Sequence, residues 1–360
     1  MPVKRLPPRP NLDHLKGQAG DLIANCRRRD ARACQRLREF HPRYRDVTDA
    51  RIGEASLTWS DGLVAIAREY GFASWARLRA HVLAGRDTGD MPLIDRIEDP
   101  LFRHALEMID DGDVETLRAL LAAHPDLASR RVAFEGQNYF RAPALLAFVA
   151  ENPVRNDSLP ANIVEVARLL LESGTGNADI DDTLGLVASG RVAREAGVQC
   201  ALIELLVEAG ADPGGAMLAA LGHGEFEAAR CLRASGASES LAFAAAMGDV
   251  AMAQCLLPQA GATERHQALA LAAQHGQAGV LRLLLEAGVD PNRFNPPTLH
   301  GHSTPLHQAA YHGHEGAVHA LMAHGARTDI ADTLWNEVPS GWARHAGQEH
   351  IVALLEAESR

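Results

Sequence analysis

A glycine that follows a short apolar helix recurs along most of this chain, and this recurrence constrains the fold more than any other feature. The intervals between successive glycines are 36, 26, 25, 27 and 37 residues. Glycine adopts a positive φ at no steric cost and often ends helices. Units of this length cannot bury their own apolar faces, so they are expected to stack into a solenoid. The glycines are Gly174, Gly210, Gly236, Gly261, Gly288 and Gly325.

Each unit is expected to contain two helices. In the predicted second helices an apolar stripe recurs, as where Val280, Leu283 and Leu284 fall at positions i, i+3 and i+4. The predicted first helices are rich in alanine, as at 241–246 and 269–273, which favours helix and lets neighbouring helices approach closely. The pattern predicts an all-α solenoid of about 7–8 helix pairs, preceded by a small helical domain.

One unit has a specific motif. Residues 303–314 read Ser-Thr-Pro-Leu-His-Gln-Ala-Ala-Tyr-His-Gly-His, which matches T-P-L-H-x-A. The chain therefore resembles ankyrin-repeat proteins over about 99–358, most strongly at 303–332. Residues 67–78, Ala-Arg-Glu-Tyr-Gly-Phe-Ala-Ser-Trp-Ala-Arg-Leu, resemble a helical leader that precedes many bacterial ankyrin arrays.

The domain organisation follows from these patterns. In the leader we expect one pair of helices within 12–40, separated near Asp30, and another pair broken at Gly71, with Ser74 as an N-cap. The predicted segments are a flexible N-terminus at 1–11, a basic helical domain at 12–86, a linker at 87–98, an ankyrin array at 99–338 and a C-terminal capping repeat at 339–360.

Charge is distributed unevenly between these segments. Residues 1–86 contain 17 Lys+Arg against 9 Asp+Glu, and the remaining residues contain 18 against 37. One interpretation is that the basic N-terminal helices, above all Arg27–Arg38, bind nucleic acid. Asp30 and Glu39 interrupt that stretch, and no reading helix is recognisable. We therefore expect a solvated arginine face, or attraction between the two halves, and keep nucleic-acid binding as an alternative.

The first ten residues contain no apolar run that suits a signal peptide, and no stretch approaches the roughly 20 apolar residues of a membrane span. A cytoplasmic protein without a membrane partner is expected, and a monomer is compatible with the pattern.

By resemblance, a protein partner would bind the concave surface made by finger tips and first-helix residues, so the chain is expected to be a non-enzymatic scaffold or adaptor. The short intervals between glycines indicate units without a finger, whereas 291–303 forms a long one. Aromatic and arginine side chains are favoured at interfaces. The candidate contact residues are Gln274, His275, Arg293, Phe294, Leu299, His300, His302, Gln308, Tyr311, His312 and Trp335.

Histidines give a second alternative, because nine of the 17 lie between residues 300 and 350. Such density suggests a metal or small-ligand site, with an enzymatic role included. The spacing opposes it, since His314 and His319 at i and i+5 stand about 140° apart on a helix. The resemblance gives His307 a structural role, which leaves His300 and His302 without one. We expect no metal, no cofactor and no catalytic residue.

Overall fold

The computed structural model is helical in its regular elements, which confirms the predicted all-α class. Its contacts divide the chain into two compact units, residues 1–211 and 212–360, and each is described by itself. The described residues are 4–7, 10, 12–83, 97–134 and 139–358.

The leader forms two helix pairs where the sequence predicted them. Asp30 caps the second helix by accepting a hydrogen bond from the Ala33 amide at 2.9 Å, and Ser74 accepts one from the Arg77 amide at 3.3 Å. Two short elements, η1 and α3, were not predicted, because six residues or fewer show no readable apolar period. The elements are α1 (Leu12–Arg27), α2 (Ala31–Phe40), η1 (Pro42–Tyr44), α3 (Asp49–Glu54), α4 (Trp59–Glu69) and α5 (Trp75–Leu83).

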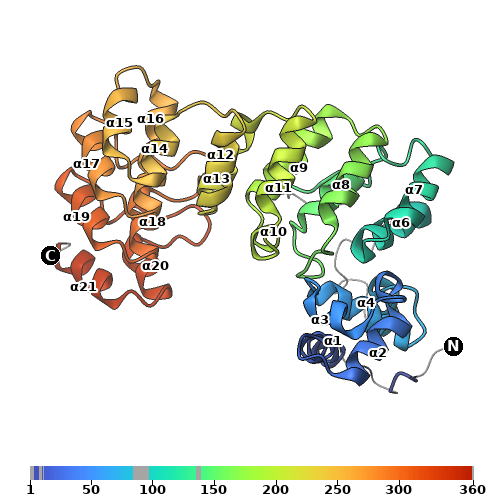
Figure 1. Ribbon diagram of the computed structural model, residues 1–360. Helices are drawn as coiled ribbons and strands as arrows, with labels where there is room; N and C mark the ends of the chain where they lie inside the picture. Colours follow the sequence, from blue (N-terminus) through green and yellow to red (C-terminus); the bar gives the residue numbers. More distant parts are fainter. Residues whose placement is uncertain (1–3, 8–9, 11, 84–96, 135–138, 359–360) are drawn as a thin grey trace. The chain divides into compact units, whose positions relative to one another are not determined.

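The array begins within the first unit. Residues 152–160 contain no helix. The elements are α6 (Pro100–Asp111), α7 (Val114–Ala123), η4 (Leu145–Ala150), α8 (Ile163–Glu172), α9 (Asn177–Ala188), α10 (Arg191–Glu195) and α11 (Gln199–Glu208) (Figure 1).

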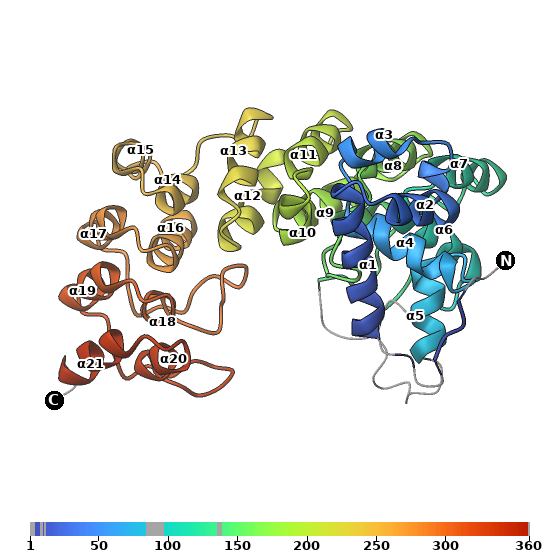
Figure 2. The ribbon, with the colours of Figure 1, turned by 60° about the horizontal axis from the view of Figure 1, so that its bottom comes forward.

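Within its described residues, 212–358, the second unit contains five stacked helix pairs. Figure 2 shows α14, α16, α18 and α20 in one layer and α15, α17, α19 and α21 in another. Leucines such as Leu269, Leu284 and Leu321 fill the space between the layers and are fully buried. The elements are α12 (Pro213–Gly222), α13 (Phe226–Ala234), α14 (Leu241–Met247), α15 (Val250–Leu256), α16 (Ala262–Gln274), α17 (Ala278–Glu286), α18 (Pro305–Tyr311), α19 (Glu315–Ala323), α20 (Pro339–His345) and α21 (Glu349–Glu358).

Five of the six repeat glycines adopt the positive φ expected of them, with values between 80° and 110°. Gly261 does not. Its φ is −72°, and it is the N-cap residue of α16. The prediction is wrong there because α15 already ends at Leu256, and a short turn without a finger leads directly into the next helix.

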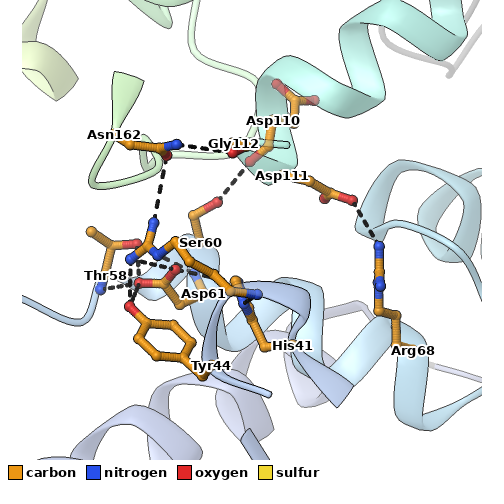
Figure 3. A network of polar contacts seen from close by, with 11 residues as sticks. His41, Tyr44, Thr58, Ser60, Asp61, Arg68, Asp110, Asp111, Gly112 and Asn162 are labelled. Carbon is orange, nitrogen blue, oxygen red and sulfur yellow. Dashed lines mark hydrogen bonds and ion pairs between the residues drawn. The ribbon is translucent and has the colours of Figure 1, made fainter. Parts of the chain in front are cut away.

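Polar contacts join the leader to the first pairs of the array (Figure 3). The Ser60 hydroxyl donates to the Asp110 carbonyl at 3.1 Å, and the Arg68 guanidinium lies 3.9 Å from the Asp111 carboxylate. The Asn162 amide donates to the Gly112 carbonyl at 2.9 Å, so the start of α8 is tied to the C-terminal end of α6.

The predicted linker at 87–98 lies outside the described residues except for 97 and 98, and so does much of the predicted N-terminus at 1–11. Among the described helices, none is both long enough and apolar enough to cross a membrane.

Candidate functional site

A groove of about 1220 Å³ lies within the second unit, between the ends of the first helices and two fingers. Eleven of its 19 lining residues carry an aromatic ring, and we call it the aromatic groove. The rings belong to Phe226, Tyr311, Trp335, Trp342, His223, His275, His300, His302, His312, His314 and His345.

Two predicted contact residues, Gln274 and His275, stabilise the groove by hydrogen bonds between the helices that line it. The Gln274 side chain donates to the carbonyl of Gly222 at 2.7 Å, and His275 Nε2 donates to that of Leu221 at 2.7 Å. These bonds connect α16 to α12 past α14, which has only seven residues. A short intervening helix therefore lets the C-terminal ends of α12 and α16 approach each other.

The long finger, residues 289–304, folds back over α12 and α16. Leu299 is 1% exposed, and its Cδ2 would lie 3.0 Å from a Cβ placed on Gly222. The Phe294 carbonyl accepts a hydrogen bond from His266 Nε2 at 2.8 Å. Of the predicted finger residues, His300 and His302 line the groove, whereas Leu299, Phe294 and the exposed Arg293 do not.

The second finger, residues 326–338, is organised by one carboxylate, that of Asp332. It accepts hydrogen bonds from the backbone amides of Leu334, Trp335 and Glu337 at 2.8, 2.7 and 3.0 Å. Burial alone would raise the pKa of Asp332, but these amides and the Trp342 indole lower it to about 2. Figure 2 shows that both fingers project from the helices on the side away from α19 and α21.

Four rings pack together where the fingers meet α18 and α20. The ring centroid of Trp342 lies 5.6 Å from that of His302, 5.6 Å from that of Trp335 and 5.9 Å from that of Tyr311. The centroids of His302 and Trp335 are 5.4 Å apart. Aromatic pairs prefer such tilted and edge-to-face arrangements. Trp335 nevertheless remains 64% exposed.

Sequence reasoning missed Trp342, although the repeat register could have found it. Trp342 stands three residues after Pro339, as the predicted Gln308 stands three residues after Pro305. Gln308 is buried and donates to the Ser303 hydroxyl at 3.0 Å. At the position where the unit of α18 has the amide side chain of Gln308, the last unit has the indole of Trp342.

The histidine signature of the T-P-L-H motif has the structural role that the resemblance implied. His307 Nδ1 accepts from the Thr304 amide at 3.2 Å, and its Nε2 donates to the Glu337 carbonyl at 3.1 Å. His307 thus connects the start of α18 to the base of the second finger.

Burial lowers the pKa of three groove histidines, His275, His300 and His312. The charges of His302, His223 and His312 lower the pKa of His300 further. Since an ordinary imidazole titrates near 6.5, these three are neutral at pH 7. Within the described residues no group of three or more His, Cys, Asp or Glu side chains could hold a metal ion.

Three of the six arginines in the basic stretch Arg27–Arg38 are paired with acidic groups of the same domain. Arg36 forms two hydrogen bonds to Glu69, at 3.0 and 2.7 Å, and Arg29 lies 3.2 Å from Glu54. Arg38 is paired with Asp49. These pairs neutralise half of the arginine charge that a phosphate backbone would require from this stretch.

Comparisons with known proteins identify the repeats. The family profile described as ankyrin repeats (3 copies) matches residues 191–333. Human cyclin-dependent kinase 4 inhibitor B is 35% identical over 125 residues, which cover 33% of this chain and 87% of the relative. The bovine protein of that name is 35% identical over 82 residues, 23% of this chain and 60% of the relative. Human cyclin-dependent kinase inhibitor 2A is 34% identical over 82 residues, and the match covers 50% of that relative's length.

Proposed function

This chain belongs to the ankyrin-repeat family, and from that premise we propose that it acts by binding another protein, as a non-enzymatic scaffold or adaptor. The names of the relatives describe inhibitors of cyclin-dependent kinases. Such an inhibitor acts on another protein. We assign the contact to the aromatic groove.

The observation that carries this proposal is the position of exposed apolar side chains. Six large ones are exposed in the described part of the chain, and three of them, Tyr311, Leu334 and Trp335, lie on α18 or the second finger. Tyr311 is 39% and Trp335 64% exposed, and both line the groove. Concave surfaces with exposed tyrosine and tryptophan are typical of protein-binding sites, because such rings bury a large area at small entropic cost.

The structure refines which residues we propose as contacts. His300, His302, Tyr311, His312 and Trp335 are retained from the sequence prediction, since all of them line the groove. We leave out Arg293, Phe294 and Leu299, which do not line it. Gln274, His275 and Gln308 are assigned to holding the groove in shape.

The test is a capture experiment with the full chain immobilised. Tyr311→Ala combined with Trp335→Ala should reduce captured protein at least tenfold, because truncating two central aromatic anchors costs several kcal/mol, about 2 or more each. The matched control is Val154→Ala combined with Val250→Ala, which truncates two exposed side chains outside the groove. Equal capture by both double variants, with unchanged melting temperatures, would reject the groove as the contact surface.

A further inference from the structure

The unit that contains the groove is acidic and has no lysine. Residues 212–360 contain 15 Asp+Glu against 8 Arg. Besides histidines, the charged residues that line the groove are Glu337 and Arg344. The Arg344 guanidinium lies 2.6 Å from the Glu356 carboxylate, so its charge is already balanced. The groove therefore offers one carboxylate, that of Glu337, without a matching cation.

Three imidazoles that line the groove add no positive charge to it at pH 7. His275, His300 and His312 come from α16, the first finger and the end of α18, and burial favours the uncharged form of each. The remaining titratable groups at the groove are Glu337, Arg344, Tyr311, His223, His302, His314 and His345. At these three positions a cation that enters the groove meets a neutral ring rather than an imidazolium ion.

The indole of Trp335 is held in place before any ligand arrives. Its backbone amide donates to Asp332 at 2.7 Å, and its ring packs edge-to-face against His302 and Trp342. Most of its surface stays open, at 64% exposure. A guanidinium is planar and weakly hydrated, so it stacks on such a ring and can direct its remaining N–H groups to a carboxylate. Glu337 lines the groove two residues further along the same finger.

Resting on the proposed function, we propose that the aromatic groove takes an arginine side chain from a segment of the partner protein, with the guanidinium on Trp335 and paired with Glu337. Lysine fits less well, because an ammonium is compact, strongly hydrated and cannot stack. A nucleic acid is disfavoured, since its phosphates would approach an acidic unit.

The test uses the full chain and four fluorescent probes at about 0.15 M salt, which screens long-range attraction. The probes are hexa-arginine, hexa-citrulline, hexa-lysine and hexathymidylate. Citrulline has the shape of arginine without its charge, so hexa-citrulline should bind at least tenfold more weakly than hexa-arginine. Hexa-lysine should bind more weakly than hexa-arginine, and hexathymidylate should not bind. Equal binding of the arginine and citrulline probes, or tighter binding of either of the other two, would overturn the proposal.

Variants separate the groove from general attraction to an acidic protein. Trp335→Ala and Glu337→Gln should each weaken hexa-arginine binding about 2- to 5-fold, as expected for one cation–π contact or one exposed ion pair. Glu286→Gln removes an exposed carboxylate from α17 and should change nothing. The Glu337→Gln side chain keeps its shape, so misfolding does not confound the result. Identical weakening by Glu286→Gln and Glu337→Gln would also overturn the proposal.

The two proposals can fail separately. If hexa-arginine binds every variant alike while the Tyr311→Ala, Trp335→Ala chain loses its captured protein, the arginine assignment is wrong and the groove still binds a partner. If that double variant captures protein normally, the groove is not the contact surface, and the site given to the proposed function is wrong.

Discussion

The indole Nε1 of Trp342 donates a hydrogen bond of 3.0 Å to Oδ2 of Asp332, ten residues earlier in the chain. The same carboxylate accepts hydrogen bonds from three backbone amides of the second finger. The Asp332 side chain is buried, with 3% of its surface exposed. One buried side chain therefore fixes both the path of the finger and the ring of the next helix against which Trp335 packs.

Replacing Asp332 by Asn should loosen the finger and lower the free energy of unfolding by about 2 kcal/mol, because hydrogen bonds to a charged acceptor are lost and an NH2 group faces N–H donors. Urea unfolding followed by tryptophan emission measures the change. Asp329→Asn is the control, since Asp329 is exposed and its carboxylate pairs with Arg327. An equal effect of the two substitutions would contradict the role given to Asp332.

Acid titration should reveal the same carboxylate. The folded pKa of Asp332, about 2, lies below the ordinary value near 3.9, so the unfolded chain binds the proton more readily. Its contribution to stability is therefore present above about pH 4 and is lost as the pH falls toward 2. The Asp332→Asn chain should lose less free energy of unfolding than the natural chain over that window. Parallel losses in the two chains would show that Asp332 is not the titrating group.

The contrast between His307 and Asp332 shows how far the sequence could be interpreted. The role of His307 was predictable because its motif carries both partners in a fixed register, Thr304 three residues before it and the finger that precedes the next unit. Asp332 has four donors within ten residues, yet no motif specifies the turn that brings them together. Trp335 was predicted as a contact residue. That Trp335 would meet Trp342 depends on the shape of a finger that no repeat pattern encodes.

Gly276→Ala should be destabilising by about 1–2 kcal/mol. The φ of Gly276 is 69°, and an added Cβ would lie 2.7 Å from the His314 ring. The strain would also disturb the bond of 3.0 Å between His314 Nε2 and the Gln274 carbonyl beneath the groove. Thermal unfolding monitored by circular dichroism measures it.

Gly316→Ala is the matched control for Gly276→Ala. In α19 the added Cβ would meet only the Ala278 Cβ at 3.6 Å, an ordinary contact, and helical alanine is favoured over glycine by about 0.5–1 kcal/mol. The free energy of unfolding should therefore fall with Gly276→Ala and rise with Gly316→Ala. Destabilisation by both to the same extent would contradict the strain assigned to Gly276.

Stability should fall on mild acidification because burial lowers the pKa of several histidines, among them His41, His266, His275 and His307. A folded pKa below the unfolded value of about 6.5 means that the unfolded chain binds protons first as the pH drops. The stabilising contribution is thus present above pH 6.5 and is lost below it, toward the folded pKa. Melting temperatures between pH 7.5 and 5 measure the effect.

A His307→Gln chain should show a shallower loss of stability between pH 7 and 5, whereas exposed His319→Gln should follow the natural chain. If removing His307 leaves the slope of melting temperature against pH unchanged, its burial is not what makes the array sensitive to acid.

Asp61 and Asp111 are buried where the leader contacts α6. Replacing each carboxyl group by an amide should change the free energy of unfolding in different directions. Burial raises the pKa of both, but His41, 3.3 Å away, and Arg43, 3.4 Å away, bring that of Asp61 below its ordinary value. Asp111 has a pKa well above the ordinary range, since Arg68 at 3.9 Å compensates its burial only in part. Figure 3 shows the two side chains on opposite sides of the junction, Asp61 in the leader and Asp111 on α6.

At pH 7, Asp61→Asn should lower the free energy of unfolding by about 2 kcal/mol, and Asp111→Asn should raise it or leave it unchanged. The advantage of Asp111→Asn should grow as the pH rises from 4 to 7, because ionising the natural side chain costs free energy only above its unfolded pKa. Urea titrations at both pH values test this. A loss of stability with Asp111→Asn at pH 7 would show that its charge is used.

Residues near the candidate site differ in how well the sequence located them. His300 and His302 were located by their place on a long finger, and the structure puts both at the groove. Leu299, one residue earlier, was assigned to the same surface, but an apolar side chain on a finger that folds back over Gly222 is buried instead. The sequence shows that a finger is long and does not show which way it bends.

The contacts of α4 with α6 also limit how the molecule can change over generations. Repeat proteins gain and lose units readily, because each new unit finds on its neighbour the same apolar face that it would have found anywhere else in the row. At the first pair, Ser60 and Arg68 of the leader contact Asp110 and Asp111, so a domain that does not repeat lies against this pair. Duplicated units can therefore be accommodated inside the row or at its far end, and the leader marks the fixed end from which the row is counted.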